Sequence, residues 1–137
     1  MIMMEMIAKF RKLARTHAKQ LFSRMGGASP LFHFPVSEQI LFAKRLGMIL
    51  RSGTPILEGL DLLHKHTASR SVSYVYHKLK EHIAKGQSLS SGLAEFPRFF
   101  GEFAVHIVRV GEITGTLPDN LNYLAEELKK RQALNKK

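Results

Sequence analysis

Three kinds of side chain in this 137-residue sequence could take part in chemistry: seven histidines, several serines near residue 90, and one glutamate in a glycine-bounded turn. Cysteine is absent, which excludes thiolate nucleophiles, disulfides and cysteine-ligated metals. His64 and His66 are two residues apart and would point to different faces of a helix, and no histidine pair has the H-E-x-x-H spacing of a zinc site. We therefore interpret the histidines as residues of the surface or its rim.

Serine and phosphate chemistry are not indicated either. Ser88, Ser90 and Ser91 have no His/Asp arrangement at a usable spacing that would make one of them a nucleophile. No G-x-x-x-x-G-K-[ST] segment is present to cradle a nucleotide phosphate. The sequence therefore predicts a domain that is not an enzyme and has no cofactor.

Glu112 is the carboxylate whose position invites a specific role, because it follows Gly111 and precedes a turn at Gly115. It could bind a metal cation, or it could bind a basic residue of a partner subunit. In the third interpretation it bonds to nearby backbone or to an arginine. The sequence leaves these three alternatives open.

The net charge of +10 is confined to the two ends of the chain. Residues 1–36 hold six basic side chains and one acidic one, and residues 129–137 hold five basic and no acidic side chains, which leaves a neutral region between them. Basic flanks on a neutral body are typical of a domain held near an anionic membrane surface. The basic residues that we expect to face a membrane or a partner are Lys9, Arg11, Lys12, Arg15, Lys19, Lys129, Lys130 and Arg131.

A small helical DNA-binding regulator is the alternative that size and net charge suggest. Such a regulator presents several lysines and arginines on one face of a folded helix, and no helix predicted between residues 37 and 128 does so. We therefore expect no nucleic-acid partner. The most apolar stretch, residues 103–110, is interrupted by His106 and Arg109 and is too short to span a membrane.

The elements that must position these residues all follow the helical period. An amphipathic helix is predicted over residues 2–24, and a linker rich in glycine and proline follows it. Six helices follow, separated by short turns, at about 37–52, 55–66, 72–85, 88–96, 100–114 and 116 into the basic tail. The predicted fold is an all-α, six-helix antiparallel bundle over residues 37–137, preceded by a basic amphipathic arm and linker over residues 1–36.

Some details of these helices can also be predicted. Ser37 and Thr54 are expected as N-caps, with Pro55 at the first position of its helix. We expect the helix over 100–114 to be the most buried one. Its core stripe would be Phe99, Phe100, Phe103, Ile107 and Val110.

A turn pattern recurs along the chain. Residues 53–60 and 86–93 share the form Gly-x-x-aliphatic-x-x-Gly-Leu, and residues 115–121 are a looser third case. The first glycine is expected to end a helix at positive φ, and the second allows two helices to approach closely. The residues that define these turns are Gly53, Pro55, Gly59, Gly86, Ser88, Gly92, Pro97, Gly111, Glu112 and Gly115.

These turns resemble a known family. Residues 42–60 resemble the first helix pair of the F domain of type II secretion systems, which also occurs in inner-membrane platform proteins of type IV pili. Residues 85–97 resemble that family's G-x-S-L-x-x-A-L segment with its following F-P. Residues 110–117 resemble its motif G-E-x-[ST]-G-x-L. The three matches keep the family's order and spacing over about residues 36–134.

The resemblance implies a scaffold on the cytoplasmic side of the bacterial inner membrane. Such a platform binds a cytoplasmic assembly ATPase and other inner-membrane subunits, and passes conformational work to a pilin or pseudopilin. It also implies that the chain is a piece of a longer protein with a membrane helix beyond residue 137 and a second copy of the domain. A homodimer is a further expectation. The choice between pilus and secretion machine stays open.

The arm, residues 1–36, is not covered by the resemblance. Its amphipathic helix has three interpretations: it packs on the body, it lies on the membrane through its apolar face and basic flank, or it binds a partner.

Overall fold

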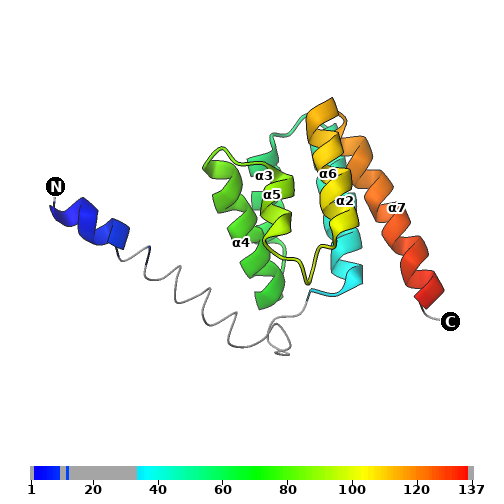
Figure 1. Ribbon diagram of the computed structural model, residues 1–137, viewed down its shortest axis with the longest axis horizontal. Coiled ribbons are helices and arrows are strands. Elements are labelled where there is room, and N and C mark those ends of the chain that lie inside the picture. The colour runs from blue at the N-terminus through cyan, green and yellow to red at the C-terminus, as the bar shows by residue number, and fades with distance from the viewer. Residues whose placement is uncertain (1, 10–11, 13–33, 136–137) are drawn as a thin grey trace. The chain divides into compact units, whose positions relative to one another are not determined.

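The computed structural model describes residues 2–9, 12 and 34–135 (Figure 1). The chain divides into two compact units, residues 1–32 and 33–137. In the first unit, the described residues 2–9 and 12 are helical, and the apolar side chains of Ile2, Met3, Met4, Met6 and Ile7 are exposed. The remainder of the predicted helix over 2–24, and most of the linker, lie outside the described residues.

The second unit consists of helices joined by short turns, and residues 34–135 contain no strand. The helices are α2 (Val36–Arg51), α3 (Ile56–Lys65), α4 (Arg70–Ala84), α5 (Leu89–Ala94), α6 (Glu102–Thr114) and α7 (Leu117–Asn135). The predicted all-α fold and its six body helices are thereby confirmed. In Figure 1, α2, α6 and α7 lie together on one side of the unit and α3, α4 and α5 on the other.

Glycines end three of these helices. Gly53, Gly86 and Gly115 have φ of +92°, +81° and +72°, which confirms the expected left-handed conformation. Pro35 and Pro55 occupy the two N-cap positions for which Ser37 and Thr54 were expected. Those two expectations were wrong because proline fixes its own φ near −65° and can precede a helix without a donor or a capping side chain.

The contacts between helices define the core. α7 packs along α2 and α6, α3 packs on α2 and α4, and α5 packs on α4 and α6. An aromatic cluster closes one end, where the Phe34 ring lies 5.7 Å from Phe99 and 5.2 Å from Phe100. The centre is aliphatic, with fully buried leucines at positions 46, 60, 79, 89, 93 and 121.

The predicted core stripe of α6 was partly wrong. Phe99 and Phe100 are buried, but the buried face of α6 is Ala104, Val108 and Gly111. Phe103 and Ile107 are half-buried, and Val110 is 36% exposed. α7 approaches closely at Gly111, where an added Cβ would lie 2.9 Å from the Leu117 Cα.

The expectation that α6 is the most buried helix was wrong as well. Four of the six residues of α5 are buried, against three of the 13 residues of α6. The short α5 lies between α4 and α6, so both of its sides are covered.

Candidate partner-binding site

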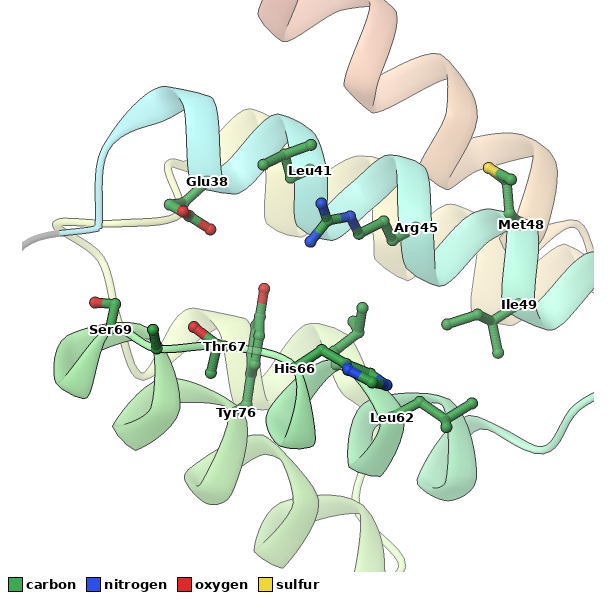
Figure 2. Close-up of a pocket in the computed structure, with 12 residues that line it drawn as sticks. Glu38, Leu41, Arg45, Met48, Ile49, Leu62, His66, Thr67, Ser69 and Tyr76 are labelled. Carbon is green, nitrogen blue, oxygen red and sulfur yellow. The ribbon is translucent and has the colours of Figure 1, made fainter.

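An open cleft has α2 on one side (Figure 2). On its other side are the C-terminal end of α3 and the turn that leads into α4. Its volume is about 800 Å³. Six of its twelve lining residues are apolar, and the other six carry polar or charged groups. Apolar surface with polar groups that fix orientation is the usual composition of a binding site. The residues that line it are Glu38, Leu41, Arg45, Met48, Ile49, Leu62, Leu63, His66, Thr67, Ala68, Ser69 and Tyr76.

One wall of the cleft is a single face of α2. Glu38, Leu41, Arg45 and Met48 follow one another at steps of three and four residues, so they share that face. The opposite face of α2 is buried and includes Ala43. The cleft wall is therefore a side of α2 that the neighbouring helices leave partly uncovered.

The other wall comes from the connection between α3 and α4. α3 ends at Lys65 and α4 begins at Arg70, and the turn between them carries polar side chains beside the aliphatic end of α3. Tyr76 of α4 forms the floor, with its ring stacked on Phe42 of α2 at 5.8 Å between centroids.

Three polar groups meet above this floor. In Figure 2 the hydroxyl end of Tyr76 points toward α2, with Glu38 on one side of it and Arg45 on the other. Tyr76 is only 4% exposed. Burial raises the pKa of its phenol, Glu38 raises it further, and Arg45 acts in the opposite sense, so the hydroxyl remains a protonated donor at neutral pH. Within residues 34–135, none of these three side chains has a hydrogen bond or ion pair.

Apolar side chains are exposed at one end of the cleft. Met48 is 63% exposed and Leu62 is 42% exposed, and they stand on opposite walls (Figure 2). Exposed apolar residues beside polar groups that lack a hydrogen-bond or ion-pair partner are typical of a surface that another protein covers.

Glu112 lies away from the cleft, and its two oxygens accept hydrogen bonds from backbone. Oε2 accepts from the Leu89 N–H at 2.8 Å and Oε1 from the Ser90 N–H at 3.0 Å. The carboxylate of α6 therefore caps the first turn of α5, where N–H groups lack helical partners. Of the three alternatives this geometry matches a bond to backbone, although the backbone belongs to a helix more than 20 residues away.

The other turn residues serve packing and capping. An added Cβ at Gly92 would lie 2.9 Å from Cδ2 of Leu79, and one at Gly59 would lie 3.1 Å from Cγ2 of Ile49. The Ser88 hydroxyl accepts from the Ser91 N–H at 3.2 Å and caps α5. Pro97 is exposed in the turn that follows α5.

Two histidines form side-chain hydrogen bonds between neighbouring helices. His64 Nε2 lies 2.9 Å from the Ser73 hydroxyl, across α3 and α4, and His82 Nε2 lies 2.7 Å from the Ser91 hydroxyl, across α4 and α5. Desolvation, and then the nearby charge of Lys80, lower the pKa of His64. In the part of the chain that the structure describes, no group of three His, Asp or Glu side chains could hold a metal ion.

An ion-pair cluster joins the outer sides of α3 and α4. Asp61 lies 2.7 Å from Lys80 Nζ and 3.0 Å from Lys65 Nζ. Hydrogen bonds from Lys80 and then Lys65 lower the pKa of Asp61 to about 2.

The predicted basic residues fall into two groups. Lys9 and Lys12 are exposed in the first unit, and Arg11, Arg15 and Lys19 lie outside the described residues. Lys129 and Lys130 pair with Glu126 and Glu127 at 3.5 and 3.3 Å, and Arg131 lies over the Phe103 ring at 4.1 Å from its centroid. All three are on the exposed final turns of α7.

Among the described helices, none combines the length and the apolar character that a membrane span requires.

The cleft was not predicted from the sequence. The spacing of Glu38, Leu41 and Arg45 could have indicated a mixed polar and apolar face on α2. No signal along the chain brings Tyr76 or the turn after α3 to that face, because these contacts join residues far apart in sequence.

Comparison with known proteins agrees with the motifs. The family described as type II secretion system, protein F, matches residues 42–137. The type 4 fimbrial assembly protein PilC of Pseudomonas putida is 32% identical over 96 residues, which are 70% of this chain and 24% of that protein. The type IV pilus assembly protein PilC of Myxococcus xanthus is 34% identical over 85 residues, 62% of this chain and 20% of that protein.

A secretion protein is similar over the whole chain. The type II secretion system protein F of Vibrio cholerae is 23% identical over 137 residues, all of this chain and 32% of that protein. The chain thus spans about a quarter of the length of the first curated relatives it matches. The resemblance drawn from the three turn motifs is confirmed, and the chain belongs to the protein F family of type II secretion systems.

Proposed function

We propose that this chain is a cytoplasmic domain of an inner-membrane platform protein that scaffolds the assembly of a pilus or pseudopilus. Its work is to bind other subunits, among them the assembly ATPase and further inner-membrane proteins. The single observation that carries this proposal is the family match over residues 42–137, with relatives named for type IV pilus assembly and for type II secretion.

Two features of the fold support a binding role. The cleft between α2 and α3 leaves apolar side chains and unpaired polar groups open to a partner. The basic final turns of α7 suit an anionic membrane surface, where each lysine or arginine contributes about 1 kcal/mol. A scaffold uses such surfaces without any chemistry of its own.

Affinity purification of the full-length protein from membranes of its own host tests the proposal. We expect the assembly ATPase and at least one inner-membrane subunit of the same machine to co-purify. A matched sample that lacks residues 34–135 should lose the partners that this domain binds. Purification of the intact protein without any subunit of a pilus or secretion machine would contradict the proposal.

A further inference from the structure

The cleft on α2 is long enough to accommodate a helix. From Glu38 to Ile49 its α2 wall runs for about 17 Å, or three helical turns. Both walls are built from helices and the turn between them, and residues 34–135 offer no strand edge to which an extended peptide could add. A groove of this length, half of whose lining residues are apolar, fits one face of another amphipathic helix.

The charges in the cleft restrict which helix can fit. Glu38 and Arg45 are seven residues apart on one face of α2, so they stand about 10 Å apart along its axis. They have opposite signs, and neither has an ion-pair partner among residues 34–135. A helix that buried both charges without opposing them would bear a desolvation cost.

The hydroxyl of Tyr76 adds a second and independent requirement. The residue is 4% exposed, its hydroxyl is directed into the cleft, and no group in residues 34–135 hydrogen-bonds to it. Covering the cleft with a purely apolar surface would leave this donor buried and unpaired, which is costly. The occupant therefore has to bring an acceptor to the space between Glu38 and Arg45.

We propose that this cleft binds an amphipathic α-helix of another subunit, which presents aliphatic side chains together with one acidic and one basic residue about two turns apart. The acidic residue pairs with Arg45 and accepts from the Tyr76 hydroxyl, and the basic residue pairs with Glu38. Aliphatic side chains cover Met48 and Leu62. The inference names a partner surface of the scaffold domain and so rests on the function proposed above.

A designed helical peptide of about 18 residues tests this pattern by fluorescence anisotropy with the whole 137-residue chain. The peptide carries leucines at helical spacing and one glutamate and one lysine two turns apart on the same face. Arg45→Glu should weaken binding about tenfold, because two like charges would then meet. Exchanging the peptide's glutamate for lysine should recover that loss with Arg45→Glu and weaken binding to the wild type.

Matched variants separate recognition from general charge and from unfolding. Lys44→Glu makes the same charge change on the neighbouring, exposed position of α2, outside the cleft lining, and should leave the affinity unchanged. Tyr76→Phe removes only the hydroxyl and should weaken binding about threefold to tenfold. Circular dichroism and thermal unfolding should show each variant folded.

Several results would overturn the inference. These are no binding of the designed peptide, equal losses with Lys44→Glu and Arg45→Glu, or affinity that no cleft substitution changes. Self-association abolished by Arg45→Glu would instead identify a second copy as the occupant. Peptide binding that appears only after removal of residues 1–33 would identify the chain's own N-terminal segment.

Site-specific photo-cross-linking identifies the natural occupant. With the photoreactive residue at Met48 of the full-length protein, the cross-linked peptide should come from a subunit of the machine and carry the predicted pattern, and the same probe at position 44 should not capture it. If the affinity purification recovers the machine while cleft variants retain every subunit, the cleft inference fails and the proposed function stands. If the peptide binds as expected but no machine subunit co-purifies, the proposed function fails.

Discussion

The contact among α5, α6 and α7 is closed, whereas the cleft between α2, α3 and α4 is open. Both contain charged side chains, but only those of the closed contact find partners within residues 34–135. At the first, Gly111 of α6 lets α7 approach until an added Cβ would lie 2.9 Å from the Leu117 Cα. The carboxylate beside it is fully engaged by two backbone N–H groups. At the cleft, two charged residues and one hydroxyl are left without partners in residues 34–135. Polar groups that a fold needs are satisfied within it, and groups left unsatisfied at an open surface are available to another molecule.

Overpacking the closed contact should have the largest effect. Gly111→Val should lower the free energy of unfolding by about 2–3 kcal/mol, because the new methyl groups meet backbone that must shift. Urea denaturation followed by circular dichroism measures this loss. Ile113→Ala, at a position 77% exposed on the same helix, is the control and should change stability little. Equal stability of Gly111→Val and wild type would show that the contact is loose.

Removing the carboxylate from the same contact should cost somewhat less. Glu112→Ala should lower the free energy of unfolding by about 2 kcal/mol, because two charge-assisted bonds to α5 are lost. Glu112→Gln keeps one acceptor oxygen and should lose less, and Arg109→Ala on the exposed side of α6 should lose almost nothing.

The cation alternative for Glu112 has a separate test. A bound divalent cation would raise the unfolding temperature of the wild type and not that of Glu112→Gln. We expect calcium or magnesium to leave both unfolding temperatures unchanged. A rise confined to the wild type would restore the metal interpretation.

A pH titration tests the ion pairs between α3 and α4. The pKa of Asp61 is about 2 in the folded chain against an ordinary aspartate value of 3.8, so its ionised form is favoured by folding. The stability it contributes is complete above about pH 4 and is lost as the pH falls toward 2. Asp61→Asn should therefore reduce the acid sensitivity of unfolding in that range. Glu58→Gln on the same helix is the control, and an identical acid profile for the two variants would contradict the pairing.

Changes in the open cleft should affect stability least. Met48→Ser combined with Leu62→Ser should change the free energy of unfolding by less than about 0.5 kcal/mol, since Met48 is 63% exposed and Leu62 42% exposed. The same double variant should reduce binding of the designed peptide. A loss of stability above about 1 kcal/mol would mean that the cleft residues stabilise the fold, as the contact among α5, α6 and α7 does. The comparison between the two regions would then fail.

Local residue pattern was sufficient to predict most of the helices. Gly53, Gly86 and Gly115 mark three helix ends because only glycine takes positive φ without strain. Helical periodicity between them predicted the six body helices and the all-α fold. The N-caps at Pro35 and Pro55 were missed because a proline just before a helix and one at its first position have the same local signature.

Pattern could not decide which of two apolar faces of a helix is buried. On α6 the buried residues are Ala104, Val108 and Gly111, and the larger Phe103 and Ile107 are only half-buried. At Gly111 the closeness of α7 leaves no room for a side chain, and that closeness depends on residues after the next turn. Phe103 instead lies beneath Arg131.

The sequence by itself determined the helices, the family and the location of the excess charge, because φ preferences, helical periodicity and motif spacing act between near neighbours. The tertiary structure alone decided what Glu112 binds and which residues line the cleft. Glu112 meets N–H groups more than 20 residues away, and the cleft joins one face of α2 to a turn and to Tyr76. Such contacts depend on how three helices pack together, and no local rule along the chain specifies that packing.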